Sequence, residues 1–556
     1  MIRISRRKFL AQAAAVGALP LLAACSQPAT PSPTAAPKAT EAPKPAATTA
    51  PAPAATKAPA AAAPKGGTLR LATIGETPSM DPHFTTANIN TEITAHITET
   101  LFTYDEKLAN VPLLAESAET SSDGLTRTVK LRKGIKFHNG KEMTADDVEA
   151  SLLRWSKMAG RGKMLFQRVD SLSKPDPYTL VFKMNARFSV FETILSFRSQ
   201  AAVIMPKEQV VAATEKNQIS NPIGTGPYKF EEWLKDRYVR LSRFDKYHGG
   251  VGDKPNGAGG KRAPFFEELR FMPTPDQSVR LAGVQSGEFD YAEGINPDQV
   301  GLLKDSKTVS LVLGVWSKCP THYINKKSEI TKDVKLRQAM MAVIDPEAAL
   351  KAGWGSPDFY RTNGALMPKE DGPGWQYYTQ VAVENFNKKS LELGKKLLGE
   401  SNYKGEPIRY LTNREYPNMY QEAVVLNQNF QALGLNMKFE VIDWASVVTR
   451  RAKPEEWELF VTWNGHNVDP VLIDFMDPVY PGWWTNPKID ALRDKMLETL
   501  DPKERFATWE NVQRLFYEEV PLLKLGDVRD VYITSAKLKG IGVYPAPFFW
   551  QATMTS

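Results

Sequence analysis

The side chains of this chain that are best suited to ligand chemistry are aromatic. Four tryptophans and a tyrosine gather in one short stretch, at Trp457, Trp463, Tyr480, Trp483 and Trp484. Indole faces supply large contact areas and stack on sugar rings or apolar side chains. The same residues also fill ordinary protein cores. The cluster therefore predicts either a binding surface or a packed interior.

No catalytic or metal-binding pattern accompanies the aromatic cluster. The six histidines are scattered, and no two of them stand at the i, i+4 spacing of a helical metal site. The sequence contains neither a Gly-x-Ser-x-Gly elbow nor a phosphate-binding glycine-rich loop with lysine. We therefore expect a protein that is not an enzyme and needs no cofactor or metal, although a triad assembled by folding would leave no trace here.

The first 25 residues have the pattern of an export signal. Ser5–Leu10 contains the pair Arg6-Arg7 and resembles a twin-arginine signal, whose route carries folded proteins. The apolar run over 11–24 is shorter than the roughly 20 residues of a membrane span. Leu22–Cys25 resembles a lipobox, so we expect Cys25 to be diacylated and to become the mature N-terminus. The alternative is a buried cysteine at the end of an N-terminal helix.

Residues 26–65 are expected to form a tether between the lipid and the folded part. They consist almost entirely of Ala, Pro, Thr and Lys and include ten prolines. Such a segment has too little apolar bulk to offset the entropy of ordering, and proline keeps it extended. Residues 1–65 also carry the whole net charge of +7, so the remainder is neutral. Nucleic-acid binding, which needs a basic folded surface, loses its main support.

The remaining residues, 66–556, are too many for one core and predict two or three lobes of mixed α/β structure. Alternating polar and apolar residues predict strands over 68–72 and 180–184, and apolar residues three or four apart predict helices over 488–500 and 503–518. With Cys25 lipidated, Cys319 has no disulfide partner, and we expect it to be a small buried hydrophobe.

Local signals add a helix start and several turns. Thr144 with Asp147 three residues later has the pattern of a helix cap. The glycine-rich stretch 247–262 is expected to be a surface loop. Asn139-Gly140 favours a tight turn with positive φ, and Gly224–Pro227 predicts a second turn. We interpret both turns as scaffold, with His138 as a loop or capping residue.

Several of these segments, taken in order, resemble one family. It comprises the large extracytoplasmic solute-binding proteins of family 5, which serve dipeptide, oligopeptide and nickel importers. The motifs that carry the resemblance are Gly66–Arg70, Met80–Pro82, Glu99–Phe102, Val111–Glu116, Leu131–Gly140, Thr144–Val148, Gly224–Tyr228, Gln285–Asp290 and Val334–Ala339.

The resemblance implies an α/β, periplasmic-binding-protein-like fold of the large family 5 type. In this fold two lobes are joined by two hinge strands and enclose the ligand. On that basis we expect lobe one to comprise 66–312 and 521–556, and lobe two to comprise 313–520. Val520–Leu525 resembles the family's return strand.

The peptide-binding members of the family hold the ligand's α-ammonium with an aspartate in lobe two. Here the matching segment is Thr462–Pro470, and the anchoring position is His466. This is a departure, because a neutral imidazole cannot neutralise an ammonium and a charged one repels it. Asp469 is a possible substitute, and equally a turn residue before proline.

Dipeptide-binding members also clamp the peptide carboxylate with an arginine before a long lobe-two helix. The register here puts Asn413 at that position and Arg414 one residue later. A shift of one residue in a loop could bring Arg414 to the ligand. Alternatively, Arg414 pairs with Glu415 or points to solvent.

Among the aromatic residues, Trp463 stands beside the family's anchor position and is our first choice for a ligand contact. Trp316 and Tyr323 flank the expected first crossing into lobe two and are weaker candidates. The alternative for each is ordinary core packing.

The resemblance implies an importer component that captures a peptide or similar small polar solute and delivers it to an ABC permease with its ATPase subunits. We expect a monomer, anchored by Cys25 at the outer face of the cytoplasmic membrane, in a periplasm or at a cell surface. An oligosaccharide is the main alternative ligand, favoured by the lost anchor and the tryptophans. A nickel chelate, through His466, and a tethered sensor or chaperone-like peptide holder also remain open.

Overall fold

The computed structural model describes residues 66–214, 217–295, 297–303, 305–369, 371–544 and 546–555. The expected signal peptide, Cys25 and the tether lie outside these residues. Within them, no helix has both the length and the apolar character needed to cross a bilayer.

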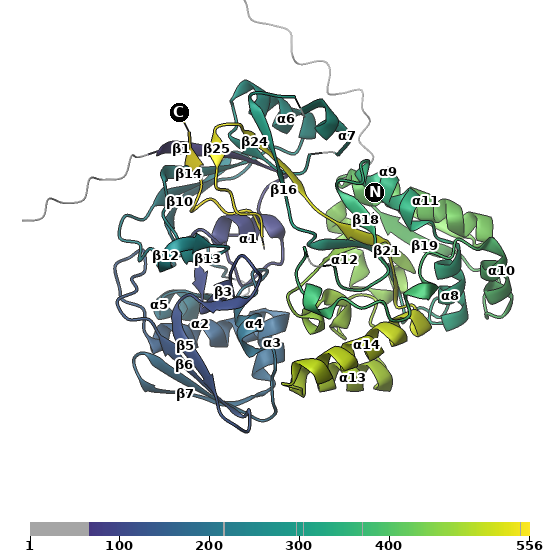
Figure 1. Cartoon of the computed structure of the whole chain (residues 1–556), viewed down its shortest axis with the longest axis horizontal. Helices are drawn as coiled ribbons and strands as arrows, with labels where there is room; N and C mark the ends of the chain where they lie inside the picture. Colours follow the sequence, from purple (N-terminus) through teal and green to yellow (C-terminus); the bar gives the residue numbers. More distant parts are fainter. Residues whose placement is uncertain are drawn as a thin grey trace, which may run out of the picture. The chain divides into compact units, whose positions relative to one another are not determined.

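The first large sheet has seven strands and defines lobe one. Its inner strand β1 (Gly66–Thr73) pairs in parallel with β14 on one side and with β15 on the other. The order across the sheet is β10 (Tyr228–Leu234), β11 (Tyr238–Arg243), β14 (Phe266–Pro273), β1, β15 (Tyr291–Ala292), β24 (Val531–Ser535) and β16 (Val309–Leu313). The last residues of the chain thus supply an inner strand of a sheet that the first described residues begin (Figure 1).

The second large sheet also has seven strands and defines lobe two. Figure 1 shows its strands among the helices α8 (Val334–Val343), α9 (Pro346–Trp354), α10 (Leu391–Gly399) and α11 (Pro417–Leu433). The strand order is β18 (Tyr360–Thr362), β23 (Gly526–Val528), β17 (Lys318–Ile324), β21 (Leu459–Gly465), β19 (Ile408–Thr412) and β20 (Met437–Val441), with β22 (Leu522–Lys524) pairing β17.

The chain passes between the two sheets twice. The first crossing, residues 314–317, joins β16 to β17, and the second, residues 529–530, joins β23 to β24. The second crossing lies later than the expected boundary at 520/521, because β22 and β23 both pair with lobe-two strands. The segment that begins at residue 521 was expected to return to lobe one. It first adds β22 and β23 to the sheet of lobe two.

A smaller antiparallel sheet lies within lobe one, in the order β5 (Ala115–Thr120), β6 (Thr126–Leu131), β8 (Thr179–Met184) and β7 (Val169–Asp176). Helix α2 (Ala145–Met158) precedes β7 and begins as predicted, because the Asp147 carboxylate accepts the backbone N–H of Thr144 at 3.0 Å to form a capping box. The predicted strands over 68–72 and 180–184 are confirmed by β1 and β8.

Two predicted turns hold the helix α1 (Asn88–Thr94) and the strand β2 (Glu99–Thr100) in place. Gly140 has a φ of +86°, as the tight turn requires. His138 joins this turn to the second one, because its Nδ1 accepts the Gly224 N–H and its Nε2 contacts the Gly226 carbonyl at 3.0 Å. Backbone N–H groups at the second turn donate to the carbonyls of residues 96 and 97, just after α1.

The glycine-rich stretch 247–262 is more ordered than expected. It forms an antiparallel hairpin of β12 (Gly250–Asn256) and β13 (Gly259–Lys261). The prediction of a plain surface loop is therefore wrong, because positive φ angles at Gly250, Gly252 and Gly260 let this strand pair bend sharply.

The C-terminal third contains the predicted helix pair, as α13 (Pro487–Glu498) and α14 (Pro502–Glu519). Cys319 lies within β17, 1% exposed, and its burial raises the pKa of the thiol to about 12. This is the inert, hydrophobe-like cysteine that the sequence predicted.

The remaining elements are short connections. The strands are β3 (Phe102–Tyr104), β4 (Asn110–Pro112), β9 (Val203–Ile204), β25 (Leu538–Lys539) and β26 (Thr553–Met554). The helices are α3 (Gly160–Phe166), α4 (Phe191–Ser196), α5 (Lys207–Ala212), α6 (Gln277–Ser286), α7 (Pro297–Val300) and α12 (Trp444–Arg451).

We expect Gly224→Ala to destabilise lobe one, because the added Cβ would stand 2.1 Å from the carbonyl oxygen of Ile97. Overpacking of this kind costs roughly 1–3 kcal/mol. The midpoint of denaturant unfolding measures the effect. The control Gly67→Ala meets no atom within 4 Å and should leave the midpoint almost unchanged. Equal midpoints for the two variants would contradict this role of the turn.

Candidate functional site

The two crossings bring a charged pair to the junction of the lobes. Lys318, the first residue of β17, forms an ion pair with Asp530 of the second crossing, with 2.6 Å between Nζ and Oδ2. The backbone N–H of Gly314 donates to the Asp530 carbonyl at 2.9 Å. Asp530 therefore holds the two crossings together.

Lobe two contributes aromatic rings beside this pair. The Lys318 ammonium lies 5.2 Å from the ring centre of Trp463, within cation–π range. Tyr416 meets both Trp463 and Trp444 edge to face, at 5.1 and 5.4 Å between ring centres. The indole nitrogen of Trp463 is buried without a hydrogen-bond partner among the described residues.

Lobe one contributes two glutamates to the same junction. Glu92 lies on α1 and Glu293 follows β15, and each is only 7% exposed. Their carboxyl groups lie within hydrogen-bonding distance of one another. Burial raises the pKa of both, and the charge of Glu293 raises the pKa of Glu92 further.

Tyr416 of lobe two faces this carboxyl pair across the junction. Burial raises the pKa of its phenol, and the nearby charges of Glu293 and Glu92 add to the effect. This electrostatic interaction links the aromatic residues of lobe two with the carboxyl pair of lobe one.

A further charged residue, Arg198, follows α4 and contacts the C-terminal segment of lobe one. Its guanidinium lies over the Trp550 ring at 5.4 Å. Among the described residues, its Nε and one Nη are buried without a hydrogen-bond partner. Burial, and then repulsion from Arg262, lower the pKa of Arg198 to about 9.

His466, the family's anchor position, is part of a closed ionic network. Its Nε2 lies 3.1 Å from Oδ1 of Asp527, and that carboxylate also accepts bonds from Lys524, Arg361 and Asn363. Burial opposes ionisation, yet Lys524, His466 and Arg361 hold the pKa of Asp527 well below its usual range. Burial lowers the pKa of His466, so the ring is neutral.

Asp469 is committed to a second ion pair. Both of its carboxylate oxygens accept bonds from Arg505, at 2.7 and 3.0 Å. Oδ1 also accepts the N–H of Val471 and so caps the short turn after Pro470. This arrangement matches the turn-residue alternative and argues against Asp469 as a replacement anchor.

The two residues of the expected carboxylate clamp have other contacts in the structure. Asn413 is fully buried, and its Oδ1 accepts the N–H of Tyr416 at 2.9 Å, which shapes the turn before α11. Arg414 is exposed, with its guanidinium over Tyr420 at 5.2 Å. Asn413 therefore acts indirectly, because it positions Tyr416.

Trp316 lies within the first crossing, and Tyr323 lies beyond it in β17. Trp316 is stacked between the guanidinium groups of Arg361 and Arg529, at 4.5 and 4.6 Å. Tyr323 is 2% exposed and donates its hydroxyl to Asn464 at 2.8 Å. Tyr323 thus packs in the core of lobe two. Trp316, in the first crossing, contacts Arg529 of the second crossing.

The structure joins residues that sequence reasoning did not select. Glu92, Glu293 and Tyr416 belong to no motif, and about 200 residues separate the two glutamates. The only available signal was the position of Tyr416 just beyond the expected clamp. Of the predicted site residues, only Trp463 lies in this group.

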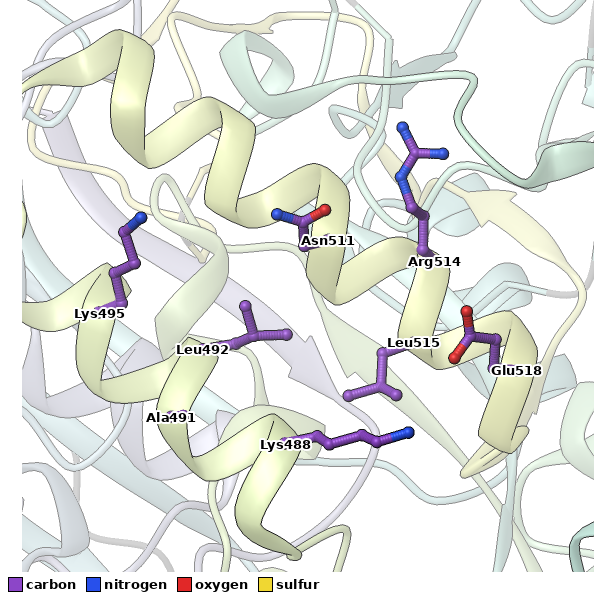
Figure 2. A pocket seen from close by; sticks show the side chains of 8 residues that line it. All are labelled: Lys488, Ala491, Leu492, Lys495, Asn511, Arg514, Leu515 and Glu518. Carbon is purple, nitrogen blue, oxygen red and sulfur yellow. The ribbon is translucent and has the colours of Figure 1, made fainter.

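Two cavities of the described residues lie away from this junction. One of about 460 Å³ lies between α13 and α14, where Leu492 and Leu515 form the floor and Lys488, Lys495 and Arg514 are among the lining residues (Figure 2). A second, of about 960 Å³, is lined by residues of β4, β5 and the β12–β13 hairpin. No predicted site residue lines either cavity. Across the described ranges, no group of three metal-ligating side chains forms.

The lobes also touch far from the crossings. Arg168 of lobe one forms ion pairs with Asp494 and Glu498 of α13, at 3.2 and 3.1 Å. Ser189 donates its N–H to the Leu497 carbonyl at 2.7 Å. Arg161 donates to the Leu472 carbonyl at 2.9 Å. The two lobes therefore contact each other through these groups as well as through the crossings.

Comparison with known proteins agrees with this architecture. The family model for bacterial extracellular solute-binding proteins, family 5, matches residues 110–486. A probable peptide ABC transporter periplasmic-binding protein from Sinorhizobium fredii is 28% identical over 498 residues, which cover 85% of this chain and 90% of the relative.

Two solved structures show the same fold. The binding protein DppA from Helicobacter pylori, in complex with the peptide STSA, has a TM-score of 0.77 at 21% identity and covers 89% of this chain and 99% of its own. AgaA from Agrobacterium tumefaciens, in complex with agropinic acid, has a TM-score of 0.76 at 21% identity, with 88% and 99% covered. The match over most of the chain confirms the resemblance that the sequence motifs indicated, and the chain belongs to the bacterial extracellular solute-binding proteins of family 5.

Proposed function

We propose that this chain is the binding protein of an ABC-type importer and captures a peptide or similar small polar solute between its two lobes. The observation that supports this most directly is the meeting of charged and aromatic side chains from both lobes beside the two crossings. In a family of solute-binding proteins, such a junction is where a ligand can touch both lobes at once. The permease and its ATPase subunits are the proposed partners, and the relatives named above are binding proteins rather than enzymes.

Within this proposal, Trp463 and Tyr416 form the apolar wall of the site. Their rings can cover an extended solute without selecting for one particular ligand side chain. This tolerance suits a peptide. Arg198 is the proposed partner of a ligand carboxylate, because its unpaired nitrogens can donate charge-assisted bonds. An oligosaccharide is the second candidate, since stacking on Trp463 and an unpartnered indole N–H would also serve a sugar.

The proposal includes an anchor at the membrane. A diacyl lipid on Cys25 and the proline-rich segment to Lys65 would hold the folded part near its permease. The motifs of the first 25 residues support this part.

We expect a ligand to be retained by the purified chain and to be identified by native mass spectrometry. A mass that fragments as a peptide supports the first candidate, whereas a hexose series overturns it in favour of the second. Trp463→Ala should weaken binding of the retained ligand by at least about tenfold, as loss of a central aromatic contact does. The control Trp375→Ala removes a half-exposed tryptophan outside the junction and should leave affinity unchanged.

Binding should close the lobes and lower the radius of gyration in solution scattering. Arg168→Ala removes the ion pairs to α13, so the ligand-free chain should shift toward the open form. Exposed ion pairs contribute about 0–1 kcal/mol, so affinity should fall by no more than about fivefold. The control Arg187→Ala alters an exposed arginine bonded within lobe one. An unchanged radius of gyration with saturating ligand would contradict closure.

Cys25→Ser should release the protein from the membrane fraction into the soluble fraction. Mass spectrometry should find a diacylglyceryl group on the mature N-terminus of the parent chain and not on the variant. A parent chain that fractionates as soluble, without the lipid mass, would show that the lipobox is not used.

A further inference from the structure

We propose that Glu92 and Glu293 bind a cationic group of the ligand, an ammonium or a guanidinium. This inference rests on the proposed capture of a solute between the lobes and specifies what that solute must carry. The pair would take the place of the lobe-two carboxylate that the family's peptide binders use.

The two carboxyl groups lack a cationic partner of their own. Among the described residues, neither side chain forms an ion pair, and the nearest buried guanidinium, that of Arg280, donates to backbone carbonyls including that of Glu293. Among the described residues, the one backbone N–H bonded to either carboxyl is that of Ile74, at 3.0 Å from Oε1 of Glu293. Two adjacent buried carboxyls with so few donors are unfavourable for a folded chain unless they serve a ligand.

A second observation points to the same place. The hydroxyl of Tyr291 is buried without a hydrogen-bond partner among the described residues, and this side chain is 2% exposed. Tyr291 lies on β15 two residues before Glu293, the spacing that places two strand side chains on the same face, and its phenol interacts with the charges of Glu293 and Glu92. A ligand ammonium held by the two carboxyls would donate its remaining proton to such an oxygen.

The opposite face of the site is aromatic. Tyr416 faces the pair from lobe two, and Trp463 packs against Tyr416. Aromatic faces attract cations, and the attraction is strongest once water is excluded. Closure of the lobes would therefore place a cation between carboxylates on one side and rings on the other.

The usual position for a cation in lobe two is closed in this chain. His466 points to Asp527, and that carboxylate already accepts bonds from two cations and an amide. A ligand ammonium there would have to displace Lys524 or Arg361 from a buried network. The carboxyl pair of lobe one needs no such displacement.

Binding at the pair should release a proton. Lys318, Asp530 and Arg280 also face the two carboxyls, together with the phenols of Tyr291, Tyr416 and Tyr532. Burial raises the pKa of both carboxyls, so the ligand-free pair retains a proton at pH values where isolated glutamates are ionised. A cation favours the fully ionised pair, so affinity should rise with pH until an α-ammonium itself deprotonates near pH 8.

The first test presents the purified chain with a defined mixture of tri- to pentapeptides of Ala, Gly, Leu and Tyr, plus putrescine. A matched mixture has every amine acetylated. Native mass spectrometry should find components retained from the first mixture only. Glu92→Gln and Glu293→Gln, which mimic the protonated acid, should each weaken binding of the retained component by roughly 10- to 100-fold. The control Glu288→Gln alters an exposed carboxylate five residues from Glu293 and should have no effect.

The second test separates ligand contact from a structural role. Calorimetric titration of the retained component in buffers of different ionisation enthalpy should show release of up to about one proton per ligand. Either glutamine variant should abolish that release, while its unfolding midpoint stays at or above the parental value because one unpaired buried carboxyl is removed. Absence of proton release from the parent chain would overturn the inference.

The outcomes also distinguish this inference from the proposed function. Equal retention of acetylated peptides would overturn the role of the pair and leave peptide binding in place. Retention of putrescine without peptides would support the pair and overturn the peptide candidate. Retention of nothing from either mixture would overturn both.

Discussion

The arrangement of the whole molecule depends on two neighbouring passages of the chain between its sheets. Only residues 314–317 and 529–530 lie between the strands of one lobe and those of the other, and the bond from Gly314 to Asp530 ties them together. Because each lobe is built on a hydrogen-bonded sheet, relative motion is concentrated in these few residues. Groups beside the crossings, such as Lys318 and Asp530, move least, whereas the contacts of Arg168 with α13 move most.

Buried carboxyl groups have different surroundings in the two lobes. In lobe two, Asp527 is surrounded by Lys524, Arg361 and His466, so its burial is offset by opposite charge and hydrogen bonds. In lobe one, Glu92 and Glu293 form no ion pair with any described residue, and the charges of Lys318 and Arg280 only partly offset their burial. A stable core explains the first arrangement. The second arrangement lowers the stability of the free protein, and a bound cation would supply the positive charge that the two carboxyls lack.

Much of the fold could be predicted from the sequence, and the reasons are local. The capping box at Thr144, the tight turn at Gly140 and the helix pair over 487–519 each depend on residues within a few positions of one another. The family motifs extended these local predictions to two lobes. The β12–β13 hairpin was missed because its glycines favour a loop locally, and strand pairing outweighed that preference.

The site was harder to predict because its contacts join distant segments. The identity of His466 was read correctly as a departure, but its partner Asp527 lies 61 residues later, and Arg505 is 36 residues beyond Asp469. Family register identified positions on lobe two only. Glu92 and Glu293 lie on lobe one at positions with no motif, so nothing in the one-dimensional pattern joined them to Trp463.

The order of strands has a consequence for how the protein is made. Strand β24, inside the first sheet, comes from residues 531–535, and β22 and β23 complete the second sheet from residues 522–528. Neither lobe can finish its sheet until the ribosome has made nearly the whole chain. The usual order of co-translational folding, in which the N-terminal domain is completed first, therefore does not apply. Both sheets are therefore completed only at the end of synthesis.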